Sequence, residues 1–484
     1  MSNRVLRVAN SAALLEEGVK AIQVEQKLEP GFPADVVAAA VEAAKNPRLP
    51  DLDRTDLPFV TIDPVGSMDL DQAMHLERDG DGFVVHYAIA DVAAFVEPGG
   101  AIDVEARRRG ESMYGADDKI PLHPTELSEG AASLLPDQVR PAFLWTIKLD
   151  AEGAQRDAKV ERARVRSVAR LDYAGVQKTI DDGTADPMMQ LLGEIGRLRL
   201  RQEAERGGVS LPMPEQEIDC SRDPWTLEFR AVLDVETWNA QISLLTGFAA
   251  ASLMVYGKVG ILRTLPPAQP DAVKRLHRTA RALGIDWPAE QRYPDFIRAL
   301  DPTKPNHLAM VTACTALLRG AGYVNFDGEL PAQPEHSALA SEYAHVTAPL
   351  RRLVDRFGLE VCAALCAGTP VPDWARQGLA ELPDTMRESG HRANAYENAV
   401  LNLVEAASLS GRVGETFAGV VVEADHDDPR KGDVVVREVA VTAPVTGGAA
   451  LPIGEDLPVV LAEADPTKRV VRFRHEGGGA APLS

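Results

Sequence analysis

The stretch from Thr61 to Gln72, TIDPVGSMDLDQ, directly follows the apolar run LPFV at 57–60. It carries three carboxylates, Asp63, Asp69 and Asp71, within nine residues. The apolar run predicts a strand, and the carboxylates follow its end in what reads as a tight loop. Like charges at such short range repel each other strongly unless a cation or a proton lies among them. The stretch therefore raises the question of a metal site.

Hard oxygen ligands at this density suit Mg²⁺ or Mn²⁺, which bind few protein carboxylates and keep positions for water and substrate phosphate. A calcium loop that begins at Asp69 is excluded, because its fifth position is Ala73 and its sixth, where glycine is required, is Met74. A solvated acidic turn fits the spacing equally well. The spacing alone leaves the metal site and the acidic turn as open alternatives.

Length and composition describe an ordinary globular chain. The 484 residues are 45% hydrophobic and 25% charged, which predicts two or three domains. The net charge of −21 argues against indiscriminate binding of polyanions, so nucleic acid would need local basic groups, such as those at 162–170 and 468–475. Both groups alternate with apolar residues and equally predict half-exposed strands. No signal-like opening and no uninterrupted apolar span is seen, which predicts a cytoplasmic protein without a membrane segment.

Periodicity divides the chain into helical and β-rich parts. Helices are predicted from about residue 11, at 34–45, 238–256, 272–283, 307–319 and 350–367, and within 375–409 with a break near Pro383. Strands are predicted at 83–89 and 141–149. After Gly411, strands at 417–422, 433–441, 457–462 and 470–473 predict a small barrel of the oligonucleotide-binding kind.

Three ordered segments resemble signatures of the RNase II/RNB family of exoribonucleases. The first is the carboxylate stretch together with YAIADV at 87–92. The second runs from Met113 to Pro136 and contains PLHPTELS, and the third, at 336–352, ends in TAPLRR. Three matches in order over about 300 residues are far more specific than any one of them. The resemblance covers roughly residues 31–475.

The resemblance implies an α+β fold in four parts. These are a small helical N-terminal region at 1–55, an RNB catalytic domain with a sheet or barrel core wrapped by helices at 56–372, a helical connector at 373–410, and an S1-like OB-fold RNA-binding domain at 411–484. The 55 N-terminal residues are too few for the two cold-shock barrels of some family members, which are expected to be absent. Only Phe417 and Phe473 are aromatic after Gly411, which predicts weak base stacking there.

The family's four metal-binding aspartates fall on Asp63, Asp69, Asp71 and Gln72, so the fourth position is an amide here. The resemblance implies a two-metal Mg²⁺ site, with Mn²⁺ as an alternative ion. Asp71 is the residue expected to orient or deprotonate the attacking water. Two metal ions would orient that water and stabilise the departing 3′ oxygen.

The resemblance also implies residues that contact RNA. Tyr114 and Tyr173 would stack on the last bases at the 3′ end, and Arg351, with Arg352 beside it, would hold the phosphate. Core packing is the alternative for both tyrosines. A surface ion pair with Asp355 is the alternative for Arg351.

These residues predict a Mg²⁺-dependent, monomeric 3′-to-5′ exoribonuclease that hydrolyses single-stranded RNA to nucleoside 5′-monophosphates. Two other functions stay open. One is a catalytically weak or inactive RNA-binding RNB protein, because Gln72 replaces an aspartate and the family's Glu pair is reduced to Glu236-Thr237. The other is a metal-dependent phosphohydrolase that acts on small nucleotides.

Overall fold

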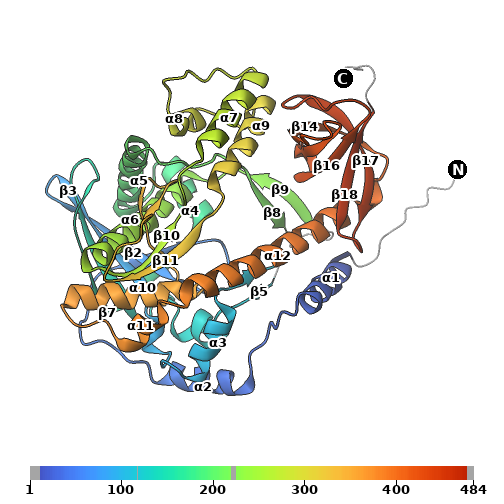
Figure 1. The fold of residues 1–484 in the computed structure, drawn as a ribbon. Coiled ribbons are helices and arrows are strands. Elements are labelled where there is room, and N and C mark those ends of the chain that lie inside the picture. Colours follow the sequence, from blue (N-terminus) through green and yellow to red (C-terminus); the bar gives the residue numbers. More distant parts are fainter. Residues whose placement is uncertain (1–10, 117, 220–224, 477–484) are drawn as a thin grey trace.

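The computed structural model describes residues 11–116, 118–219 and 225–476, which form two five-stranded closed barrels connected by helices (Figure 1). In each barrel one neighbouring pair of strands is parallel and the other pairs are antiparallel. The strand order of the first barrel is β1 (Phe59–Asp63), β2 (Gln72–Asp79), β3 (Gly82–Ala90), β6 (Val139–Leu149) and β7 (Gln155–Asp172). Its closing pair is β1 with β7, which leaves no open edge.

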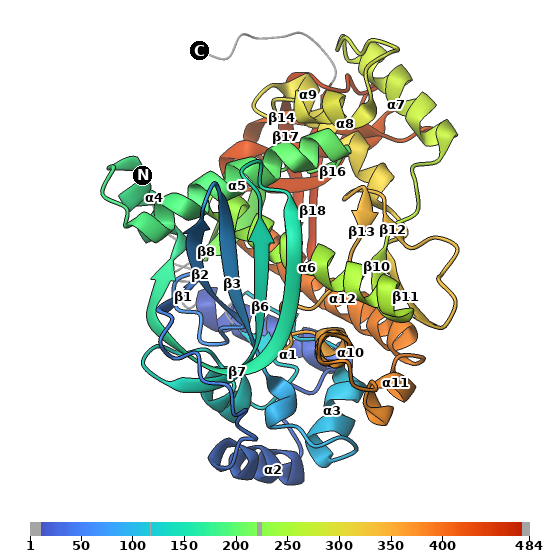
Figure 2. The ribbon, with the colours of Figure 1, turned by 90° about the vertical axis from the view of Figure 1, so that its left-hand side faces the viewer.

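Large apolar and aromatic side chains of the first barrel, including Phe83, Tyr87 and Trp145, are fully buried and belong to a hydrophobic core that they share with neighbouring helices. A tight turn between β2 and β3 requires glycine, because a Cβ on Gly82 would lie 2.1 Å from the carbonyl oxygen of Leu149. Figure 2 shows β7 running the whole length of this barrel. The strands predicted at 83–89 and 141–149 are confirmed as β3 and β6.

A buried helix, α6 (Asp234–Gly257), lies beside the first barrel and packs against α5 (Pro187–Arg206) and α10 (Leu353–Ala367). The contact with α5 is close, since a Cβ on Gly196 would lie 2.4 Å from Cβ of Trp238. Among the described residues, α6 is the one helix whose length and composition would allow it to cross a membrane, and half of its apolar window is buried inside the protein. Packing in the core accounts for its apolar sequence.

The predicted helices are confirmed. Those predicted at 238–256 and 350–367 are α6 and α10, and the others are α1 (Ser11–Glu25), α2 (Ala34–Lys45), α7 (Pro270–Ala282), α9 (Pro305–Cys314) with the 3₁₀ turn η3 (Thr315–Leu318), α11 (Asp373–Gly378) and α12 (Leu382–Leu409). Pro383 lies in the first turn of α12, where a proline is tolerated. The sequence reading did not place α3 (Ala101–Arg109), α4 (Tyr173–Asp181), α5 or α8 (Tyr293–Arg298). Four two-stranded sheets complete the described fold: β4 (Met113–Tyr114) with β5 (Lys119–Ile120), β8 (Glu215–Asp219) with β9 (Thr226–Arg230), β10 (Val259–Thr264) with β11 (Gly322–Asp327), and β12 (Glu335–His336) with β13 (Ser341–Glu342).

The second barrel corrects one strand prediction. Its strands are β14 (Thr416–Ala424), β15 (Lys431–Val436), β16 (Val441–Gly447), β18 (Val470–His475) and β17 (Asp456–Asp465), in that spatial order. The single strand predicted at 433–441 is two strands, because a 3₁₀ turn at Arg437–Val439 and the positive φ of Ala440 reverse the chain. Phe417 and Phe473 pack edge to face, with their ring centroids 5.9 Å apart. Each of the two residues is 2% exposed. Neither ring is available to stack on a base.

Candidate active site

The carboxylate stretch forms the loop between the first two strands of the first barrel. Asp63 is the last residue of β1 and Gln72 is the first residue of β2, so Asp69 and Asp71 lie at the same end of the barrel. Gly66 turns the loop with a φ of +88°, in the left-handed region that favours glycine. Gly66 therefore allows the chain to reverse direction within this loop.

Two side chains from elsewhere hold the backbone of this loop. The hydroxyl of Ser133 accepts a hydrogen bond from the Leu70 N–H at 2.9 Å and donates one to the Met68 carbonyl at 2.6 Å. Arg170 on β7 donates to the Ser67 carbonyl at 3.2 Å. These contacts fix the backbone on both sides of Asp69.

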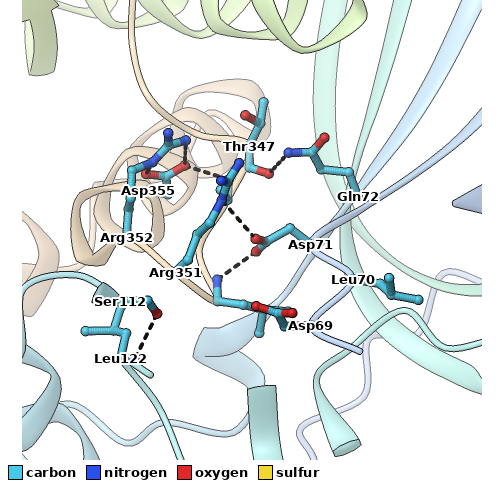
Figure 3. Close-up of polar contacts among 12 residues, drawn as sticks. Asp69, Leu70, Asp71, Gln72, Ser112, Leu122, Thr347, Arg351, Arg352 and Asp355 are labelled. Carbon is cyan, nitrogen blue, oxygen red and sulfur yellow. Dashed lines mark hydrogen bonds and ion pairs between the residues drawn. The ribbon is translucent and has the colours of Figure 1, made fainter. Parts of the chain in front are cut away.

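Asp71 is the most buried of the three carboxylates, at 6% exposure. Its Oδ1 accepts the backbone N–H of Leu350 at 2.7 Å, and its Oδ2 lies 3.6 Å from Nε of Arg351 (Figure 3). Burial raises the pKa of Asp71 to about 8, although Arg351 opposes the rise. The site thus holds a carboxylate that can accept a proton near neutral pH, with an arginine facing it.

Asp63 and Asp69 differ in their neighbours. Burial raises the pKa of Asp63 to about 6, and the charge of Asp69 adds to the rise. Asp69 instead has a cation of its own, because Nζ of Lys119 lies 2.9 Å from its Oδ1 and 2.8 Å from Oε1 of Glu129. In the described parts of the chain, no group of three or more His, Cys, Asp or Glu side chains is arranged to hold a metal ion.

Both ends of the Gln72 carboxamide are used inside the protein. Its Nε2 donates to the Thr347 carbonyl at 2.6 Å (Figure 3). Its Oε1 accepts a hydrogen bond from the buried hydroxyl of Tyr87. The amide joins the start of β2 to the segment that carries Arg351. The predicted role of Gln72 as a metal ligand would have to use the second lone pair of the same oxygen.

The two neighbouring arginines have different surroundings. Arg352 forms a bidentate ion pair with the buried Asp355, at 2.8 Å for each contact, and Asp355 also accepts the Ala348 N–H at 2.6 Å. Asp355 is therefore the partner of Arg352, and not of Arg351 as the surface alternative supposed. Arg351 is half-exposed and faces Asp71. The geometry leaves Arg351 open to a phosphate and makes Arg352 a residue that holds the turn.

The two tyrosines predicted to stack on bases lie beside the carboxylates. Tyr114 on β4 is 38% exposed, and burial of its hydroxyl together with Asp69 and Asp71 raises its pKa. Tyr173 begins α4 and is more enclosed, with its hydroxyl accepting from Nδ2 of Asn239 at 3.0 Å. Tyr114 has the ring that a base could reach from solvent.

Three other candidates from the sequence have partners within the protein. Glu236 caps α6 by accepting the Leu233 N–H at 2.7 Å and also pairs with Arg230. The basic groups at 162–170 and 468–475 lie on and beside β7 and β18, in agreement with the strand interpretation. Several of their cations form ion pairs with acidic side chains: Arg162, Arg164, Lys468, Arg469, Arg472 and Arg474.

Sequence reasoning did not find Lys119. Its position as the cross-strand partner of Tyr114 in the β4–β5 hairpin was the available signal, because the two side chains must then lie close together. The pairing with Asp69, about fifty residues earlier in the chain, depends on the tertiary fold.

Comparison with known proteins agrees with the fold. The family model described as "RNB domain" matches residues 52–358, and the one described as "RNase II-type exonuclease C-terminal S1 domain" matches residues 415–476. The first match spans more than half of the chain. The protein therefore belongs to the RNB family.

Individual relatives are distant. The probable exosome complex exonuclease RRP44 of Caenorhabditis elegans is 31% identical over 327 residues, which cover 63% of this chain and 34% of that protein. The chain spans about one to two thirds of the length of the curated relatives that it matches first.

Solved structures show the same fold at low identity. Mycoplasma genitalium RNase R in complex with ribose-methylated single-stranded RNA gives a TM-score of 0.83 at 21% identity and covers 95% of this chain and 78% of that one. Yeast Ssd1, described as a pseudonuclease, gives 0.69 at 15% identity and covers 94% of this chain and 58% of that one. At these identities the likeness concerns the fold alone.

Proposed function

We propose that this chain is a Mg²⁺-dependent exoribonuclease that hydrolyses single-stranded RNA from the 3′ end to nucleoside 5′-monophosphates. One observation supports the proposal most: a buried Asp71 faces a half-exposed Arg351 at the end of a barrel whose sequence belongs to the RNB family. RNB-domain homologues such as RNase R are exoribonucleases. Our proposal adds the Mg²⁺ dependence, the single-stranded substrate, the 3′-to-5′ direction and the 5′-monophosphate product.

The donor chemistry of the site fits a hard divalent cation. Asp63, Asp69 and Asp71 offer carboxylate oxygens, the ligands that Mg²⁺ and Mn²⁺ prefer. Burial raises the pKa of Asp63 and of Asp71, as expected for carboxylates that lack enough positive charge nearby. RNB-family nucleases are generally dependent on divalent metal. Asp63 and Asp69 would hold the metal, with Asp71 beside them, and a pair of ions is part of the proposal.

When bound, the metal would activate a water and offset the charge of the phosphodiester. The protein's own groups divide the remaining work. Asp71 orients or deprotonates the attacking water, since its Oδ2 is the carboxylate oxygen that faces Arg351. Arg351 presents positive charge to the phosphoryl oxygens as negative charge develops on them.

Recognition of a single strand rests on the ring next to the carboxylates. Tyr114 is exposed enough to stack on the last base, and Tyr173 lies closer to Asp63 with its hydroxyl held by Asn239. Stacking on an aromatic face tolerates any base, so RNA would be taken without sequence preference. A duplex has no free 3′ base to place there and should be degraded more slowly.

The test is digestion of a 5′-labelled single-stranded RNA in Mg²⁺, followed over time on a gel. We expect shortening from the 3′ end, with nucleoside 5′-monophosphates as the main product. An RNA that ends in a 3′-phosphate should be degraded more slowly than its 3′-hydroxyl counterpart. Internal fragments at early times, or nucleoside 3′-monophosphates, would contradict the proposal.

An RNA-binding protein without nuclease activity is the main alternative. It is favoured by Gln72 at the fourth aspartate position and by the engagement of Glu236 at a helix cap. Tight RNA binding with no Mg²⁺-dependent release of nucleotides would identify it. Hydrolysis of free nucleotides in preference to RNA would instead identify a small-nucleotide phosphohydrolase. The monomeric state and the cytoplasmic location stay predictions.

A further inference from the structure

Lys119 has its charged group beside the carboxylate cluster, and the proposed function leaves this residue without a role. It lies on β5, opposite Tyr114 in the hairpin register, and its side chain is 23% exposed. Its ammonium contacts Asp69 at 2.9 Å and Glu129 at 2.8 Å. Two of its three donor hydrogens are thereby directed at carboxylates.

The three carboxylates of the cluster therefore have unequal counter-charges. Asp71 has Arg351 and the Leu350 N–H, and Asp69 has Lys119. In the described parts of the chain, Asp63 takes part in no ion pair of its own. A metal that binds Oδ1 of Asp69 would therefore approach an oxygen that already contacts the Lys119 ammonium.

We propose that Lys119 is a positioning residue that acts as a built-in counter-cation for Asp69, holding it while the site is free of metal and competing with divalent metal for its Oδ1. This inference rests on the metal-binding part of the proposed function. Glu129 moderates the competition, because its Oε1 shares the same ammonium at 2.8 Å.

Repulsion between two cations at short range explains this competition. An ammonium 2.9 Å from a carboxylate oxygen stabilises that oxygen, and it repels a second cation that approaches the same atom. The side chains of Lys119 and Asp69 are only 23% and 19% exposed, so water screens this repulsion less than on an open surface. Removal of the ammonium should strengthen metal binding, and removal of Glu129 should weaken it.

The experiment measures Mn²⁺ binding to the full chain without RNA, from the electron paramagnetic resonance signal of free Mn²⁺. We expect Lys119→Met to bind Mn²⁺ at least tenfold more tightly than wild type, and Glu129→Gln to bind it several-fold more weakly. Lys119→Arg keeps the charge and should stay within about threefold of wild type.

Lys148→Met is the matched control, because the same substitution removes the same charge from an ammonium that lies 3.7 Å from Asp79, at the end of β2 opposite Gln72. It should tighten Mn²⁺ binding less than threefold. An equal effect of Lys148→Met and Lys119→Met would overturn the inference, because the change would then reflect net charge alone.

Two further outcomes separate this inference from the proposed function. Equal Mn²⁺ affinity of wild type and Lys119→Met would overturn the role of Lys119 and leave the metal site standing. No Mn²⁺ binding by wild type would overturn both. If Lys119→Met does not fold, Glu129→Gln decides, since unchanged or tighter binding by that variant contradicts the competition.

Discussion

The two barrels have the same number of strands, and each contains one parallel pair of strands. They differ in the direction in which the pKa values of the aspartates compared here are shifted. At the end of the first, burial raises the pKa of Asp63 to about 6 and that of Asp71 to about 8. In and beside the turns of the second, hydrogen bonds lower the pKa of the partly exposed Asp428 and Asp465 to about 2. Solvated, well-paired carboxylates suit a stable fold, whereas buried carboxylates with too little counter-charge suit a site that awaits a cation.

The aromatic side chains compared in the two regions also differ in their exposure to solvent. Phe417 and Phe473 are buried against each other inside the second barrel, whereas Tyr114 is partly exposed beside the aspartates of the first. The second barrel therefore uses its aromatics for stability. We expect it to hold RNA through charge and backbone contacts, and base stacking to occur at the first barrel.

A large effect on RNA turnover should follow a change of Arg351. Arg351→Lys keeps the charge but loses the planar fork, so turnover of single-stranded RNA should fall about 100-fold, measured by single-turnover digestion. Arg430→Lys in the second barrel, where Arg430 pairs with the partly exposed Asp428, is the matched control and should leave turnover unchanged. Equal turnover of Arg351→Lys and wild type would mean that the arginine is only a point charge.

A buried carboxylate next to the second barrel should limit stability instead of activity. Glu405 on α12 is 6% exposed and accepts Nε2 of Gln216 at 2.9 Å, and burial raises its pKa from 4.5 to about 7. The folded protein binds this proton more tightly than the unfolded chain, so the stabilisation is complete below about pH 4.5 and is lost as the pH rises through about 7.

Glu405→Gln removes this titration. Its free energy of unfolding should therefore rise by about 2 kcal/mol relative to wild type between pH 5 and pH 8, as measured by urea unfolding at the two pH values. Added Mg²⁺ should not reduce this difference, because Glu405 lies outside the metal site. A constant difference between the two proteins across this pH range would contradict the assignment.

A smaller effect, on RNA affinity, should follow the loss of the exposed ring. Tyr114→Ala should weaken binding of a short single-stranded RNA about tenfold, because stacking on an aromatic ring contributes about 1–3 kcal/mol per base. Tyr256→Ala removes a tyrosine that is 90% exposed at the far end of α6, and it should leave the affinity unchanged. Fluorescence anisotropy measures both, and equal affinities for both variants would place the stacking elsewhere.

The smallest effect concerns Gln72. Because Tyr87 and Thr347 engage both ends of its carboxamide, Gln72→Ala should change the Mg²⁺ concentration for half-maximal activity less than twofold. The same variant should lower the free energy of unfolding by about 1–3 kcal/mol, because two buried hydrogen bonds lose their partner. A large rise in the Mg²⁺ requirement would restore Gln72 as a metal ligand.

Local signals in the sequence predicted much of this molecule. The carboxylate stretch and the turn that carries Arg351 are contiguous motifs, and α2 is predicted to the residue because apolar periodicity marks its length. Signals for α5 were also present, since Asp186 caps it, Pro187 begins it and Gly207 ends it in the left-handed region. Its apolar residues do not form one clear stripe, and the helix was not placed.

What the sequence could not supply are pairings between distant segments. Lys119 meets Asp69 only because the β4–β5 hairpin lies next to the loop after β1. Likewise, Arg352 pairs with Asp355, whereas Arg351 faces Asp71. The spacing of these residues in the sequence does not predict which arginine pairs with which aspartate. Such choices depend on backbone geometry that no motif encodes.

The most direct test of the account is a comparison of Asp71→Asn with Asp433→Asn. Asp71 lies at the catalytic end of the first barrel, and Asp433 is a half-buried carboxylate on β15 of the second. RNA hydrolysis in Mg²⁺ and RNA binding are measured for each. We predict that Asp71→Asn lowers hydrolysis at least 1000-fold with RNA affinity within a few-fold of wild type, and that Asp433→Asn changes neither. Hydrolysis by Asp71→Asn within a few-fold of wild type would contradict the assignment of the active site to the first barrel.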